Sequence, residues 1–175
     1  MNNKIECPFP RLFPSQLEKN DEFFMQLAFN EAITAWENDE VPVGAVIADN
    51  HGEVIATANN QTRKCKDPTA HAEMLAITKA AQKIGDWRLN DCTMYVTKEP
   101  CPMCAGASVV ARIKKILFAF SDPKMGGLGG ATSIHEITYS NHKPIVLKGI
   151  MERECLQLIQ SFFKLRRESP NQNQL

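Results

Sequence analysis

One imidazole, one carboxylate and two thiols in this sequence have the types and spacing of a catalytic metal site. His71 and Glu73 are separated by one residue, and Cys101 and Cys104 by two. An imidazole nitrogen and two thiolates suit zinc, and three protein ligands leave a fourth tetrahedral position open, as in catalytic zinc sites. The sequence therefore predicts one zinc ion per chain, held by His71, Cys101 and Cys104.

Glu73 is predicted to act on a substrate rather than on the metal. On a helix, residues two apart do not share a face, so Glu73 is badly placed to chelate beside His71. Its carboxylate can instead reach the open coordination position, where zinc would lower the pKa of a water molecule. There it could accept a proton and return it to the substrate, as general base and then general acid.

The two cysteines also have a second interpretation. A strand followed by Cys-Pro-x-Cys and a helix is how thiol–disulfide oxidoreductases are built, so residues 101–104 alone divide about evenly between redox and metal roles. His71 and Glu73 favour the metal, because a redox enzyme gives them no task. The redox motif also normally follows an early strand, whereas most of this chain precedes Cys101.

The elements that must position these residues follow from the hydrophobic pattern. It predicts helices over 21–37, 70–84 (ended by Gly85), 103–111 and 152–167, and strands over 43–48, 54–58, 93–97, 115–120 and 145–147. Residues 59–69 read as a polar loop and residues 125–130, rich in glycine, as a flexible connector without the Lys-Ser/Thr of a phosphate loop. Both halves of the metal site then fall at helix N-termini of one α/β domain.

Composition limits the environment and the partners. The chain has 175 residues, with 20 basic and 20 acidic side chains and a formal net charge of zero, so attraction to a polyanion must come from local patches. Neither a signal peptide nor a membrane-spanning stretch is apparent, and we expect a reduced, cytoplasmic protein. The remaining cysteines lack ligand-like spacing and are expected to be ordinary thiols: Cys7, Cys65, Cys92 and Cys155.

His-x-Glu followed by Pro-Cys-x-x-Cys is the signature of zinc-dependent nucleobase deaminases. Within that superfamily the chain resembles the bacterial tRNA-specific adenosine deaminases, from about residue 20 to residue 168. The resemblance is carried by residues 40–46, 67–73 (D-P-T-A-H-A-E), 87–89, 95–97, 99–101, 103–107 and 162–167 (F-F-K-L-R-R). It implies a cytidine-deaminase-like fold: three α/β/α layers, with helices on both faces of a mixed five-stranded sheet.

The resemblance also implies a reaction, a partner and an assembly. The wobble adenosine of a tRNA anticodon loop would become inosine in a homodimer, with hydroxide attacking C6 while Glu73 protonates N1 and then the departing ammonia. Asn60 would bind the purine and Asp122 would lie near the ribose. The deaminase domain would span residues 21–168, between an N-terminal extension (1–20) and a polar tail (169–175).

The phosphates of a tRNA would need local cations, and the sequence offers two groups of them. These are Arg63, Lys64 and Lys66 in the loop, and Lys164, Arg166 and Arg167 near the end. A free guanine deaminase, which the chain also resembles around Cys-Pro-Met-Cys, would need no basic end. A non-catalytic RNA-binding module would have no use for Glu73.

Overall fold

The computed structural model describes residues 5–168; the predicted polar tail lies outside them. Along the chain the elements are α1 (Asp21–Glu37), β1 (Gly44–Ala48), β2 (Val54–Asn59), α2 (Thr62–Cys65), α3 (Ala72–Ile84), β3 (Thr93–Val96), α4 (Pro102–Val110), β4 (Lys115–Phe118), η1 (Ile134–Glu136), β5 (Ile145–Lys148) and α5 (Glu152–Glu168). Every predicted helix and strand is present, with ends shifted by at most two residues.

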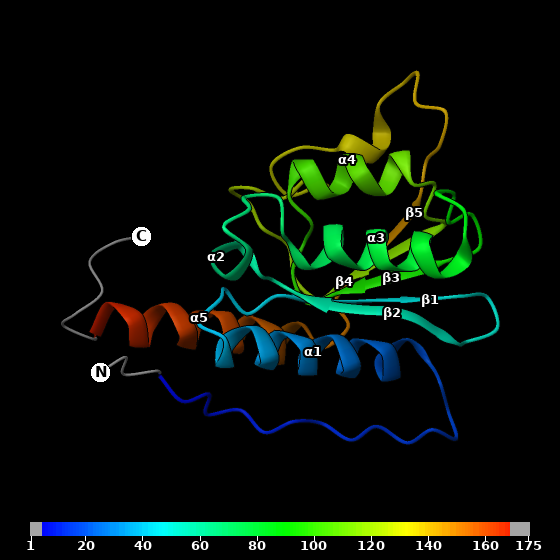
Figure 1. Ribbon diagram of the computed structural model, residues 1–175. Coiled ribbons are helices and arrows are strands. Elements are labelled where there is room, and N and C mark those ends of the chain that lie inside the picture. Colours follow the sequence, from blue (N-terminus) through cyan, green and yellow to red (C-terminus); the bar gives the residue numbers. More distant parts are fainter. Residues whose placement is uncertain (1–4, 169–175) are drawn as a thin grey trace.

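The strands form one mixed sheet in the order β2-β1-β3-β4-β5. β1 pairs antiparallel with β2 and β3, whereas β3, β4 and β5 run parallel. α3 and α4 cover one face of the sheet and α1 and α5 the other, as Figure 1 shows. The predicted three-layer fold is therefore confirmed. α4 connects the parallel strands β3 and β4, so its N-terminus follows the carboxyl end of β3, and two of the predicted metal ligands lie there.

Local sequence explains the main boundaries. The Asn20 side chain accepts a hydrogen bond from the backbone N–H of Phe23 and so begins α1. Gly85 ends α3 in the left-handed conformation, as predicted. Gly44 lets β1 approach α1 closely, since a Cβ there would collide with the backbone carbonyl of Ala28. Of the described helices, none is long and apolar enough to cross a membrane.

The predicted loop over residues 59–69 contains the short helix α2. The Glu40 carboxylate, 1% exposed, accepts hydrogen bonds from the Thr62 hydroxyl and from the backbone N–H groups of Arg63 and Lys64. These N–H groups lie at a helix start and lack partners within the helix. A carboxylate more than twenty residues away therefore supplies the cap, which no local pattern could reveal.

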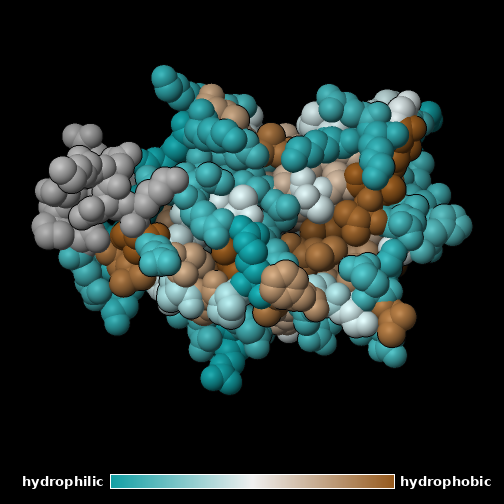
Figure 2. Space-filling view, turned by 60° about the horizontal axis from the view of Figure 1, so that its bottom comes forward, coloured by the Kyte–Doolittle hydropathy of each residue, from teal (hydrophilic) through white to brown (hydrophobic). Residues whose placement is uncertain are grey.

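Residues 5–20, the described part of the N-terminal segment, lie along α1 without forming a helix or strand. The Asn30 side chain bonds both the backbone N–H and the carbonyl of Leu12, each at 2.7 Å. The Trp36 indole donates to the Ile5 carbonyl, and Phe9 packs edge-on against Phe29. Figure 2 looks onto this side of the molecule and shows patches of hydrophobic residues separated by hydrophilic ones.

Candidate active site and metal centre

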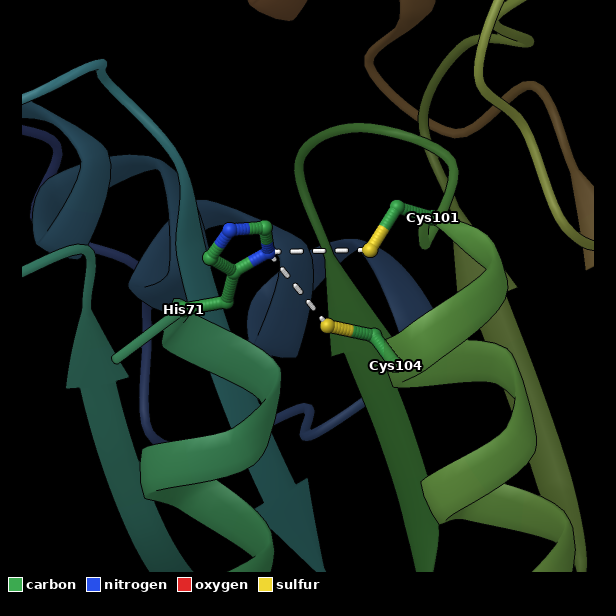
Figure 3. Close-up of side chains that lie close together, drawn as sticks. All are labelled: His71, Cys101 and Cys104. Atoms are coloured by element: carbon green, nitrogen blue, oxygen red, sulfur yellow. Dashed lines mark hydrogen bonds between the residues drawn. The ribbon is translucent and has the colours of Figure 1, made fainter. Parts of the chain in front are cut away.

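The three predicted metal ligands converge between the N-termini of α3 and α4. His71 is the N-cap of α3, Cys101 is the N-cap of α4, and Cys104 lies in the first turn of α4. Figure 3 shows the three side chains pointing toward one another. The Nδ1 atom of His71 lies 3.7 Å from Sγ of Cys101 and 3.5 Å from Sγ of Cys104, and all three donor atoms lie within 4.8 Å of one another.

These distances fit a zinc ion. Tetrahedral zinc with bonds of about 2.05 Å to nitrogen and about 2.3 Å to sulfur holds neighbouring donors about 3.5–3.8 Å apart. A mixed nitrogen and sulfur donor set also suits zinc better than the oxygen-preferring cations. The three side chains therefore form a suitable set of zinc ligands, and they leave room for a fourth.

The electrostatics of the thiol pair favour ionisation. A hydrogen bond from Cys104 lowers the pKa of Cys101 to about 3; burial opposes this and His71 assists it. The pKa of Cys104 is raised, first by the same hydrogen bond and then by burial. One thiolate is thus formed readily, and a bound cation would favour ionisation of the second thiol.

Glu73 is the acidic residue closest to these donors along α3. It is 3% exposed, and burial raises the pKa of its carboxyl. The pKa of His71 is raised, first by its hydrogen bond with Cys101 and then, against burial, by the charge of Glu73, which also acts to raise the pKa of Cys104. Glu73, His71 and Cys101 line one pocket of about 200 Å³. A buried carboxyl with a raised pKa beside a metal site is suited to proton transfer.

Asn60 lines the same pocket, with its amide bonded at both ends to the protein. The side-chain oxygen accepts from the backbone N–H of Ala72, at 2.9 Å, and the side-chain nitrogen donates to the Val41 carbonyl, at 3.1 Å. Because Ala72 is the first residue of α3, Asn60 satisfies one of the free N–H groups of that helix. It thereby fixes the position of His71.

Asp122 is outside this pocket, on the wall of a neighbouring hollow of about 440 Å³. One carboxylate oxygen accepts from the backbone N–H groups of Lys124 and Met125, and the other accepts from the Lys98 ammonium at 2.5 Å. Burial acts to raise the pKa of Asp122, but these hydrogen bonds outweigh it and the pKa is lowered. Asp122 is therefore a carboxylate at neutral pH.

Glu99, which sequence reasoning missed, organises the glycine-rich segment. It is 2% exposed, and its carboxylate accepts from the backbone N–H groups of Asp122, Leu128 and Gly130 at 2.8–2.9 Å. A Cβ on Gly126 or Gly130 would collide with that carboxylate. The expectation that the glycine-rich segment is a flexible connector is therefore corrected, because its backbone folds around the buried Glu99 carboxylate. The spacing of its glycines was the only signal in the sequence.

The two predicted groups of cations differ in exposure. Lys64, Lys164 and Arg167 are exposed. Arg166 is not: its guanidinium is ion-paired with Asp39 and lies 4.5 Å from the centre of the Phe162 ring, and the residue is 7% exposed. The expectation that Arg166 contacts phosphate was therefore wrong, because this side chain joins the end of α5 to the end of α1.

Comparison with known proteins agrees with this geometry. A family model described as the cytidine and deoxycytidylate deaminase zinc-binding region matches residues 18–120. The chain is 44% identical over 144 residues to the tRNA-specific adenosine deaminase of Bacillus subtilis (strain 168), a match that covers 82% of this chain and 89% of that one.

Solved structures share the fold, and the structure of a tRNA deaminase is more similar to this chain than that of a guanine deaminase. One, from a study of A-to-I editing by tRNA:A34 deaminases at the wobble position of transfer RNA, matches with a TM-score of 0.75 and 41% identity, over 78% of this chain and 98% of that chain. A guanine deaminase from Bacillus subtilis has a TM-score of 0.57 and 30% identity, over 89% of this chain and 98% of that chain. The chain therefore belongs to the tRNA-specific adenosine deaminases, zinc-dependent members of the cytidine and deoxycytidylate deaminase superfamily.

Proposed function

We propose that this protein deaminates adenosine to inosine at the wobble position of a tRNA anticodon. The observation that carries the proposal is 44% identity, over nearly the whole deaminase region, to a relative named for that substrate. The small pocket beside the metal ligands suits one nucleobase. An anticodon loop is single-stranded, so its base can enter such a pocket with little loss of stacking.

In this proposal His71, Cys101 and Cys104 hold the zinc ion. Zinc, when bound, supplies a Lewis acid that makes water nucleophilic near neutral pH. The protein orients the metal ligands, since His71 is held at the N-terminus of α3 and the two cysteines at the N-terminus of α4. It also contributes a buried carboxyl group, that of Glu73, for proton transfer.

Glu73 moves the protons. Its carboxylate accepts a proton from the attacking water and delivers it to N1 of adenine; a second transfer accompanies the loss of the C6 amino group as ammonia. A C6–O bond forms and the C6–N bond breaks, so water and adenosine give inosine and ammonia. The raised pKa of Glu73 suits it to both roles, because a proton carrier works best with a pKa near the operating pH.

Asn60 and Asp122 are proposed to bind substrate. The Asn60 amide lies in the pocket wall, and its two hydrogen bonds hold it in one orientation toward an entering purine. Asp122 lies just beyond, where the ribose of a base held in the pocket would emerge.

We further propose domain bounds, an oligomeric state and a cellular location. Residues 21–168 form the deaminase domain, and residues 1–20 are an extension to it. The protein is a homodimer with its sites near the interface, which light scattering during size-exclusion chromatography would test. It acts in the cytoplasm, where its proposed substrate is found.

The test is incubation of the purified protein with a tRNA transcript carrying adenosine at the wobble position, and separately with free guanine. Nuclease digestion and mass spectrometry measure inosine, and an enzymatic assay measures ammonia. We expect inosine at the wobble position and no ammonia from guanine. Ammonia from guanine without inosine in the tRNA would replace the proposal with that of a guanine deaminase.

A further inference from the structure

Lys98 lies between the catalytic pocket and the neighbouring hollow. Of the described residues that line these two cavities, it is the one common to both. Its side chain is 23% exposed and is held by the Asp122 carboxylate. On the other side it lines the catalytic pocket together with His71 and Glu73.

The surroundings of Lys98 suit an anion on the side of the hollow. The charged residues lining that hollow are Lys98, Asp122, Lys124 and Arg167, three cations and one carboxylate. An ammonium group has three N–H donors, and Asp122 accepts from Lys98 through a single oxygen. The pair therefore fixes the position of the ammonium and leaves donors for a ligand.

The chemistry of the proposed reaction sets which part of a substrate meets Lys98. C6 and N1 of the purine must enter first, because they react beside Glu73 and the metal ligands. N9 and the ribose then point toward the mouth of the pocket. A phosphodiester attached to that ribose must pass between the pocket and the hollow. Lys98 is the residue that lines both cavities there.

We propose that Lys98 binds the phosphodiester adjoining the nucleotide in the catalytic pocket, and that Asp122 holds it in place for this task. The inference rests on the proposed function and deepens it. Lys98 would make the site selective for a nucleotide within an RNA chain, since a free base such as guanine offers no phosphate at this position.

The experiment is an anisotropy titration of a fluorescently labelled anticodon stem–loop, with adenosine at the wobble position, across a series of salt concentrations. In Lys98→Met we expect the slope of log affinity against log salt to fall by about 0.7, the value for one phosphate on a single strand. Affinity at low salt should fall about tenfold, as expected for a lost hydrogen bond to a charged group. KM for this RNA should rise with kcat within about twofold.

Matched variants separate this role from simpler explanations. Lys19→Met removes another partly buried, ion-paired lysine, whose partner is Glu53, and should leave the slope unchanged. Lys98→Met leaves Asp122 unpaired, so it is repeated in an Asp122→Asn background, where the slope should again fall. Lys98→Arg keeps the charge and should keep the slope, and it also serves if Lys98→Met folds poorly.

Two outcomes would overturn the inference. One is an unchanged salt slope in Lys98→Met in both backgrounds, and the other is an equal loss of slope in Lys98→Arg. If the unchanged slope were accompanied by a fall in kcat, Lys98 would act only by positioning Asp122. Failure of the proposed function is distinguishable, because the wild-type protein would then form no inosine in the tRNA whatever the Lys98 variants do.

Discussion

At the scale of single residues, the site depends on where two helices begin. His71 and Cys101 are N-caps, so their side chains project past the helix ends toward each other. Glu73 lies farther into its helix and is buried. In the proposed mechanism this arrangement separates metal ligation from proton transfer, although all four groups lie within the first turns of two helices.

Removal of one ligand should abolish metal binding. We expect Cys104→Ser to reduce zinc from about one equivalent per chain to near zero, because a serine hydroxyl is a far weaker zinc ligand than a thiolate. Cys155→Ser is the control, since Cys155 is also a buried free thiol but is not in the donor cluster. Elemental analysis of the purified variants measures the metal. Equal zinc in the two variants would exclude Cys104 as a ligand.

The spacing of these residues was sufficient to predict the metal cluster, because His-x-Glu and Cys-x-x-Cys are local patterns. Lys98 and Glu99 gave no such signal. Glu99 acquires its role from backbone N–H groups 23 to 31 residues further along the chain, and Lys98 from a carboxylate 24 residues away. Contacts of this kind depend on the tertiary fold and leave no periodicity in the sequence.

At the scale of elements, two buried carboxylates shape the surroundings of the pocket. Glu40 caps α2, and Glu99 holds the segment from Asp122 to Gly130. The helices and strands themselves were predictable because their hydrophobic residues repeat with the right period. These two segments were not, because the backbone N–H groups that fix them also bond to distant side chains, which no local pattern reveals.

A methyl group in the glycine-rich segment should be costly. We expect Gly130→Ala to lower the free energy of unfolding by about 1–3 kcal/mol, since its Cβ would collide with the Glu99 carboxylate and the Asp122 carbonyl. Gly106→Ala in α4, where a Cβ has no neighbour within 4 Å, is the control. It should gain about 0.5–1 kcal/mol from helix propensity. Urea denaturation measures both, and a neutral Gly130→Ala would contradict the packing described.

At the scale of the whole molecule, one sheet separates two hydrophobic cores. The metal site lies at the α3 and α4 side, whereas α1, α5 and the N-terminal segment pack on the other face. The described part of that segment, residues 5–20, forms no helix or strand, so no hydrophobic periodicity predicted where it lies. Its position is set by side chains of α1, above all Asn30 and Trp36.

Detaching the N-terminal segment should affect stability and leave the metal site intact. Asn30→Ala removes both hydrogen bonds to the backbone N–H and carbonyl of Leu12. We expect a loss of about 1–3 kcal/mol in the free energy of unfolding. Gln26→Ala, on the same helix and bonded only within it to Glu22, should change stability by less than about 0.5 kcal/mol. Zinc content should be unchanged in both. Equal stability of the two variants would mean that the segment is not anchored through Asn30.

We propose that Glu73 carries protons for a zinc-dependent deamination of tRNA. The rate of inosine formation at the wobble position by Glu73→Gln, measured together with zinc content, tests this role. We expect a rate about 10²–10⁴-fold below that of the wild-type protein, with zinc still at about one equivalent per chain. A fully metallated Glu73→Gln that forms inosine at close to the wild-type rate would contradict it.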